Sequence, residues 1–363
     1  MRLTKRSQQI NGLAWAGKRE VLFSSAGAAT GALWRMATDG STEPQPVVGA
    51  LDGAREPAIA HPASGHARLA YVRVVADANI WCMKFTPEAG GGVRTEVEPA
   101  PLIESTRADL SPQFSPDGKR MVFASDRDGH LEIWVSASDG SGAAELTTLR
   151  SPRSGSPRWS PDGRQIVFDS LASGNNDIWM VGSEGGPAKR ITTEPSNDAR
   201  PSFSRDGRWI YFRSDRSGSQ EIWRMPSSAP FQPAVQLTKG GGYDVEEAPD
   251  GKLLYYTKSQ GGLWSMPVEG GEGTLVLEPV RPGLWALAEN GIYYVDAAAR
   301  LPDGAAPFEW FNFVTHKVVL VGELRKPLVL ATPTLSVTRD GRRLAWTQID
   351  RQESELMLID NFR

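Results

Sequence analysis

Cysteine, histidine and long apolar segments are scarce in this sequence of 363 residues. The single cysteine, Cys82, excludes an intrachain disulfide framework. No segment approaches the ~18 consecutive apolar residues of a membrane-spanning helix, and the N-terminal stretch MRLTKRSQQINGLAW lacks the apolar core of a secretory signal. We therefore expect neither a membrane span nor a signal peptide in the chain as written, and the compartment stays open.

An excess of positive charge is also missing. The chain has 40 Lys and Arg against 43 Asp and Glu, a net charge of −3, and no block of like charge stands out. A nucleic-acid-binding surface needs clustered Lys and Arg. We therefore expect no nucleic-acid partner.

The sequence does contain a regular repeat. Asp-Gly pairs recur about 44 residues apart, which is the length of a four-stranded propeller blade. Four tryptophans keep the same step. The two sets of markers are Asp117-Gly118, Asp162-Gly163, Asp206-Gly207 and Asp250-Gly251, and Trp134, Trp179, Trp223 and Trp264. Two independent markers in phase predict an all-β chain, a β-propeller of four-stranded antiparallel blades.

We expect about eight repeats in a single domain over residues 1–363, or seven if the weak seventh repeat is misread. The predicted repeats are 10–48, 57–103, 111–147, 156–192, 200–238, 243–277, 284–321 and 333–360. The last repeat lacks a fourth strand, and residues 2–4 look like a surplus one. We expect these residues to complete the last blade, because closing the ring removes exposed strand edges.

Within a repeat, Ser-Pro-Asp-Gly joins two apolar runs and predicts a tight turn, with Gly in a left-handed conformation. The second strands, such as Met121–Phe123 and Ile166–Phe168, are continuously apolar. Strands that are buried on both faces have this pattern. A propeller blade packs between two other blades, so both faces of its strands are buried. The dense aromatic stretch Phe308–Phe313 is either such a buried strand or an exposed edge that binds a partner.

These motifs resemble the TolB-type propeller repeats, whose hallmark is Pro-Asp-Gly after an aromatic-Ser pair. Phe114–Gly118, Trp159–Gly163 and Phe203–Gly207 carry the resemblance, and the Ser-Asp-Arg-x-Gly hairpins at Ser125–Gly129 and Ser214–Gly218 add to it. Similar repeats form the C-terminal propeller of winged-helix regulators. The resemblance implies a scaffold that binds a protein or peptide partner. It also implies a periplasmic location if the chain is a truncated relative, and otherwise a cytoplasmic one. The start within a blade favours a truncated relative.

Strand order places the second-to-third hairpins and the blade-to-blade connections on one face, around the mouth of the central channel, where loops carry function. We expect a partner to bind there, although hairpin capping is the alternative role for each residue. The predicted partner-binding residues are Asp109, Asp126, Arg127, Asp128, His130, Asn176, Asp198, Arg200, Asp215, Arg216, Tyr243 and Asp244.

Catalytic and metal-binding patterns are weak. The four histidines, His61, His66, His130 and His316, fall on different faces and cannot converge, so we expect no histidine-held metal. The remaining cofactor hypothesis is Ca²⁺ held by oxygen ligands in the channel. No Gly-x-Ser-x-Gly elbow is present. We expect a non-catalytic monomer; the alternative is a propeller lyase or hydrolase that uses Asp and Arg groups at the channel mouth as acid and base.

Overall fold

The computed structural model describes residues 9–26, 31–50, 53–62, 66–87, 93–229, 231–296, 298–329 and 332–362. Within these ranges every regular element is a β-strand, which confirms the all-β prediction. No helix in this part of the chain has the length and apolar character needed to cross a bilayer. The chain divides into two compact units, 78–349 and a smaller one made of 1–77 and 350–363. The prediction of one domain over 1–363 is untested by this division.

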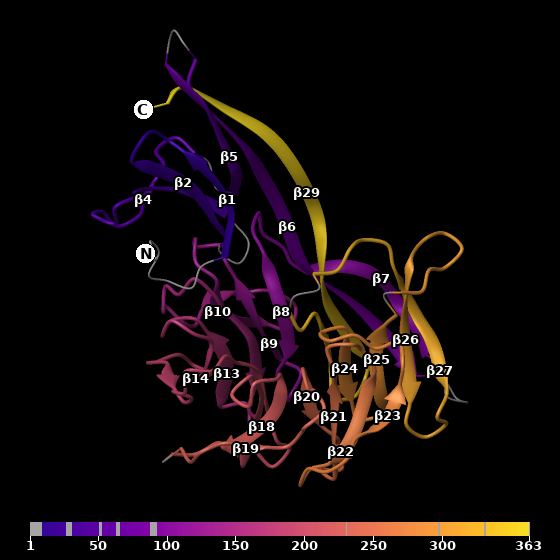
Figure 1. Ribbon diagram of the computed structural model, residues 1–363. Helices are drawn as coiled ribbons and strands as arrows, with labels where there is room; N and C mark the ends of the chain where they lie inside the picture. Colours follow the sequence, from indigo (N-terminus) through magenta and orange to yellow (C-terminus); the bar gives the residue numbers. More distant parts are fainter. Residues whose placement is uncertain are drawn as a thin grey trace. The chain divides into compact units, whose positions relative to one another are not determined.

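In the larger unit, the third to seventh repeats each form one four-stranded antiparallel sheet, with the strands in chain order (Figure 1). The first two sheets are β8 (Asp109–Phe114), β9 (Arg120–Ser125), β10 (Glu132–Ala137) and β11 (Ala144–Glu145), then β12 (Ser154–Trp159), β13 (Gln165–Ser170), β14 (Asp177–Gly182) and β15 (Lys189–Arg190). The third is β16 (Asp198–Phe203), β17 (Trp209–Ser214), β18 (Glu221–Pro226) and β19 (Val235–Gln236). The fourth and fifth are β20 (Val245–Glu247), β21 (Leu253–Thr257), β22 (Leu263–Pro267) and β23 (Thr274–Leu277), then β24 (Trp285–Ala288), β25 (Gly291–Val295), β26 (Ala306–Asn312) and β27 (Val318–Leu324).

The sixth blade of this unit combines strands from two distant parts of the chain. Its order is β28 (Leu335–Val337), β29 (Arg343–Phe362), β6 (Ala67–Pro87) and β7 (Val93–Ile103). The strands β6 and β29 are long and continue into the smaller unit. The first strands of all six blades line one central cavity, so the six sheets form a ring.

This sheet corrects the prediction for the last repeat. Its partner is strand β6 of the second repeat, so the second and eighth repeats share one sheet and the described residues contain seven sheets. Residues 2–4, predicted to complete it, lie outside the described residues. The prediction rested on the need to pair the free edge of β29. That need holds in the structure, and the long strand β6 pairs with this edge.

The smaller unit contains one meander and part of the shared sheet. The meander is β1 (Gln9–Trp15), β2 (Glu20–Ala26), β3 (Gly31–Ala37) and β4 (Gln45–Pro46). Strand β5 (Ala54–Ala60) pairs with the first part of β6. Its core contains Leu22, Leu33, Leu69 and Tyr71, all buried.

The predicted turns form by one repeated set of hydrogen bonds. In the first, Asp117 accepts from the Ser115 hydroxyl at 2.6 Å and from the Lys119 amide at 3.1 Å. The Ser115 hydroxyl accepts in turn from the Arg120 amide at 2.9 Å. Gly118 has φ of 69°, the left-handed conformation that favours glycine. The Ser-x-Asp-Gly pattern therefore specifies this turn through its side chains as well as its glycine.

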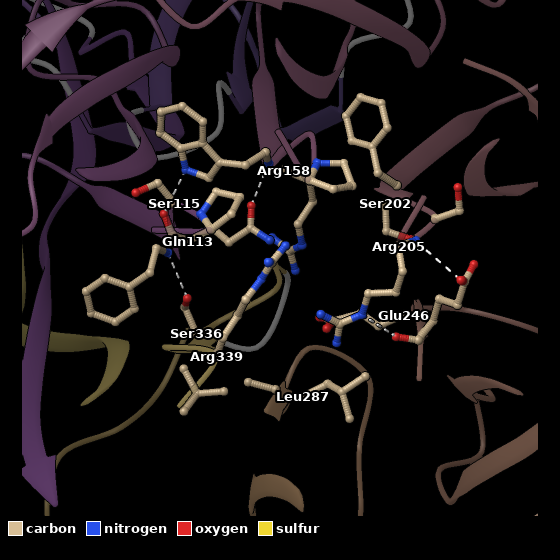
Figure 2. Close-up of a pocket in the computed structure, with 18 of the residues that line it drawn as sticks. Gln113, Ser115, Arg158, Ser202, Arg205, Glu246, Leu287, Ser336 and Arg339 are labelled. Carbon is tan, nitrogen blue, oxygen red and sulfur yellow. Dashed lines mark hydrogen bonds between the residues drawn. The ribbon is translucent and has the colours of Figure 1, made fainter. Parts of the chain in front are cut away.

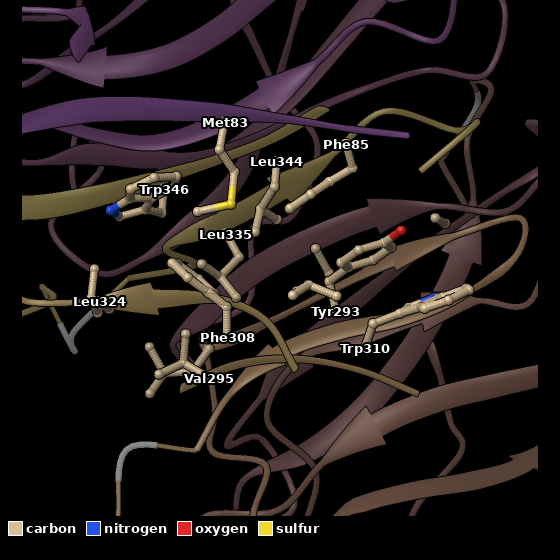
Figure 3. Packing of buried hydrophobic residues seen from close by; sticks show 14 of the residues in the cluster. Met83, Phe85, Tyr293, Val295, Phe308, Trp310, Leu324, Leu335, Leu344 and Trp346 are labelled. Carbon is tan, nitrogen blue, oxygen red and sulfur yellow. The ribbon is translucent and has the colours of Figure 1, made fainter. Parts of the chain in front are cut away.

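The aromatic stretch of the seventh repeat is a buried strand where it meets the shared sheet. Phe308 and Trp310 are buried, and the Phe308 ring lies 5.0 Å from that of Trp346 in β29 (Figure 3). Tyr293 stacks on Trp310 and on Phe85 of β6, each at 5.9 Å between ring centroids. Large rings from strands distant in sequence therefore fill the space between these two blades.

Candidate functional site: the central channel

In three of the six first strands, a bulge near the start of the strand precedes side chains that line the channel. The pairing register shifts between Leu110 and Gln113, between Gly155 and Arg158, and between Ala199 and Ser202. Each bulge contains one left-handed residue: Ser111, Ser156 or Arg200, with φ between 50° and 55°. Bulges re-aim the side chains that follow them.

The main cavity has a volume of about 110 Å³ and lies toward the Ser-Pro-Asp-Gly turns (Figure 2). Each of the six first strands contributes to its wall. The polar and charged residues among those that line it are Gln113, Ser115, Arg158, Ser202, Ser204, Arg205, Glu246, Glu247, Ser336 and Arg339. This end is opposite to the face on which the sequence placed the binding loops.

Some polar side chains of the channel wall tie neighbouring first strands together. Gln113 accepts from the Trp159 amide at 2.7 Å, and Ser336 accepts from the Phe114 amide at 3.0 Å (Figure 2). The Ser202 hydroxyl donates to the Val245 carbonyl at 2.7 Å. These residues satisfy backbone groups that no strand pairing reaches, so their role is structural.

Arg158 and Glu246 occupy the equivalent positions and behave differently. Arg158 is 9% exposed, and its hydrogen bond goes to the carbonyl of the adjacent Pro157 at 3.0 Å. Burial lowers the pKa of Arg158, while the carboxylates of Glu246 and Asp244 oppose this shift. Burial raises the pKa of Glu246, against the attraction of Arg158 and Arg205. Burial therefore disfavours the charged form of both side chains.

Arg205 and Arg339 add positive charge at the turn end of the cavity. Arg205 Nε donates to the Glu247 carbonyl at 3.2 Å. Burial lowers the pKa of Arg205; Glu246 opposes this shift and Arg339 adds to it. The Glu247 carboxylate accepts from the Tyr211 hydroxyl at 2.7 Å. Of the two carboxylates in the cavity, that of Glu247 is thus held by Tyr211. The charged ends of the arginines face the cavity.

A second, smaller cavity of about 20 Å³ lies toward the starts of the first strands and shares Arg158 and Glu246 with the main one. Arg200 and Asp244 line it and form an ion pair. The Arg200 guanidinium stacks on the Tyr243 ring at 4.5 Å. These three residues were predicted from sequence, and the structure brings them together beside the channel.

The other predicted residues mostly organise hairpins. Arg127 pairs with Asp109 at 2.7 Å, and Arg216 pairs with Asp198 at the same distance, so each hairpin arginine binds the start of its first strand. Asp126 accepts from the Ala108 amide, and Asp215 from the Asn197 amide, each at 2.8 Å. The Asn176 carbonyl accepts from the Asp198 amide. Asp128 and His130 are exposed. None of this set lines either cavity.

Sequence reasoning missed Arg158, Arg205, Glu246 and Arg339. A signal existed for two of them, since Gln113, Arg158, Ser202 and Glu246 recur about 44 residues apart in otherwise buried strands. A polar residue at a fixed position of a buried strand marks the channel side. Within the described ranges, no three His, Cys, Asp or Glu side chains are grouped as metal ligands.

Comparison with known proteins places these repeats. The PD40 model, the TolB beta propeller domain, matches residues 149–276. TolB from Acinetobacter baumannii is 15% identical, with a TM-score of 0.51 over 96% of this chain and 80% of that one. A chain of a nidogen/laminin complex is 9% identical, with a TM-score of 0.53 over 76% of this chain and 99% of that one. No curated protein matches the sequence.

A puromycin hydrolase is 18% identical with a TM-score of 0.46, and the match covers 94% of this chain and 58% of that one. That likeness is too low to bear on function. The family match confirms TolB-type propeller repeats over residues 149–276, and the TolB structure shares the propeller fold. At these identities the structural likeness concerns the fold alone.

Proposed function

We propose that this TolB-type propeller is a non-catalytic scaffold that binds a protein or peptide partner at its central channel. The observation that carries the proposal is a cavity lined by all six first strands, in which Arg158 and Glu246 are not used to tie strands together. Rigid strands hold these charges in place, which reduces the ordering cost of binding.

The residues predicted from sequence enter this proposal in two groups. Arg200, Tyr243 and Asp244 form one end of the channel and belong to the proposed site. The hairpin residues, such as Arg127 and Arg216, support that site through their ion pairs. The alternative of a propeller enzyme would use Asp and Arg groups at the channel mouth as acid and base; of these, Asp244 and Arg200 are joined in an ion pair.

A display selection with random 12-residue peptides tests the proposal. The full chain is the target, and the counter-target is the variant Val337→Trp, because Val337 is half-buried and lines the cavity. The matched control is Val235→Trp on the outer strand β19, where Val235 is 56% exposed. Melting curves establish that both variants fold.

We expect selected peptides to bind the wild type and Val235→Trp with equal affinity and to lose at least tenfold on Val337→Trp, because the indole fills the cavity. Equal binding to all three proteins would place the site elsewhere. A selection that yields no binder to the wild type would also contradict the proposal.

A further inference from the structure

Arg158 lacks the contacting carboxylate that other arginines of these repeats have. Arg127, Arg190 and Arg216 each pair with an aspartate of their own repeat, at 2.7 to 2.8 Å. Among the described residues, no ion pair joins Arg158, Arg205 or Arg339 to a carboxylate. The Arg158 guanidinium is nine-tenths buried, and burying it without a contacting carboxylate is costly, although Glu246 and Asp244 attract it from a longer distance. The cavity therefore has room and charge for an anion.

The same charge continues outside the cavity. A groove of about 600 Å³ shares Pro116 and Arg339 with the channel cavity and is also lined by Lys84, Arg342 and Arg343. Its two aspartates, Asp117 and Asp340, lie in turns, where each accepts from a hydroxyl of its own turn. Asp340 also lies 3.9 Å from Arg342 Nε, so Lys84 and Arg339 are the groove cations that carry the excess charge together with Arg343. The cationic lining thus runs from the cavity to the surface in a chain whose net charge is −3.

We infer that the partner presents an acidic peptide segment, with one carboxylate held in the cavity by Arg158, Arg205 and Arg339 and the following residues lying along the Lys84–Arg342 groove. The inference rests on the proposed function. Guanidinium groups suit a carboxylate because they donate parallel hydrogen bonds to both of its oxygens. A groove continuous with the cavity favours a chain over a free small anion.

Fluorescence polarisation with labelled peptides on the full chain tests this inference. The probes are a hexaglutamate and a hexaglutamine peptide, both acetylated and amidated, and an acetylated hexaglutamine peptide with a free C-terminal carboxylate. The last probe separates recognition of a chain terminus from recognition of acidic side chains. The variants are Arg158→Gln and Arg339→Gln; Arg339 is exposed, so its loss leaves the fold intact. The control is Arg164→Gln, an exposed residue of a Ser-Pro-Asp-Gly turn outside both cavities.

We expect the hexaglutamate probe to bind, and each channel variant to weaken binding by about 10- to 100-fold, the range for a charge-assisted hydrogen bond. Arg164→Gln should change binding less than twofold. Equal weakening by Arg164→Gln would show non-specific attraction and overturn the inference, as would equal binding of the amidated hexaglutamine probe. Tighter binding of the hexaglutamine probe with the free C-terminus than of hexaglutamate would overturn the inference of acidic side chains and identify a chain terminus as the ligand.

The display selection separates this inference from the proposed function. One outcome would support the proposed function but contradict the acidic partner. In it, the peptides lose binding to Val337→Trp, carry no acidic residue and bind Arg339→Gln as tightly as the wild type. Peptides that bind Val337→Trp as tightly as the wild type would contradict both the proposed function and this inference.

Discussion

At the scale of the residue, one position in each first strand decides what the channel can hold. Where it is Gln113, Ser202 or Ser336, the side chain bonds to a neighbouring strand. Where it is Arg158 or Glu246, the charged end faces the cavity. The same backbone can therefore build either a closed wall or a binding site, because the flanking strands stay paired within their own sheets in both cases.

The turn aspartates give the fold a dependence on acid. Hydrogen bonds from the Arg208 amide and the Ser204 hydroxyl lower the pKa of Asp206 to about 2, and hydrogen bonds of the same kind lower the pKa of Asp117 and Asp162. An unfolded aspartate titrates near about 3.9. The stabilisation is therefore complete above about pH 4 and is lost as the pH falls toward about 2.

We expect Asp206→Asn to flatten the loss of unfolding free energy between about pH 4 and pH 2. Because the Asp206 side chain is 43% exposed, solvent screening limits the effect to about 1 kcal/mol or less. Urea denaturation across this range measures it. Asp128→Asn, at an exposed hairpin residue, is the control and should leave the pH dependence unchanged; an identical flattening there would contradict the assignment to the turn.

Residue-scale prediction succeeded where chemistry is local. The turn residues Ser115, Asp117 and Gly118 determine their own hydrogen bonds, so sequence was enough. The surroundings of Arg158 depend on the first strands of the other five blades. In the sequence, Arg158 is only a single polar residue before Trp159 in a buried strand. Its role follows only once the ring places Glu246 and Arg205 around it.

At the scale of the element, the first strand combines pairing with strain. Ser156 has φ of 50° and is buried, and its hydroxyl has no hydrogen-bond partner among the described residues. A left-handed non-glycine residue costs roughly 1 kcal/mol, more if it is β-branched. This strained bulge lies directly before Arg158, whose side chain lines the channel.

Substitution of Ser156 should separate the bulge from the hydroxyl. We expect Ser156→Ala and Ser156→Gly to stay within about 1 kcal/mol of the wild-type unfolding free energy, since glycine relieves the left-handed cost but gains entropy when unfolded. Ser156→Val should lose about 2 kcal/mol, because a β-branched residue resists this conformation. Urea denaturation measures all three, and a valine variant as stable as the alanine one would argue against backbone strain at the bulge.

Strand order was predictable within the first repeat and the third to seventh repeats, while the partner of the last repeat was not. The repeat pattern places β28 and β29 as first and second strands, and the need to pair the edge of β29 also follows from sequence. Strand β6 (Ala67–Pro87) pairs with that edge, which depends on its length. In the sequence, the polar residues within Arg73–Asn79 in its middle read as a break between two strands. Pairing with the equally long β29 lets this segment continue as one strand.

At the scale of the whole molecule, residues 78–349 contain every strand segment of the six-bladed ring. A closed ring of blades leaves only short, protected strand edges, and the residues that line the central cavity lie between positions 113 and 339. The channel and the ring that holds it thus lie within one compact unit. Among the described residues of the smaller unit, none lines either cavity.

A fragment of residues 78–349 should therefore fold alone and keep the channel. We expect one cooperative urea transition and hexaglutamate binding within about threefold of the full chain. The matched control is residues 78–337, which lacks β29 and so leaves β28 and β6 without their shared partner. That fragment should aggregate or unfold without a cooperative transition, because unpaired buried edges are costly. If 78–349 also failed to fold while the full chain did so, ring closure within this unit would be insufficient, and the continuation of β6 and β29 into the smaller unit would be required for stability.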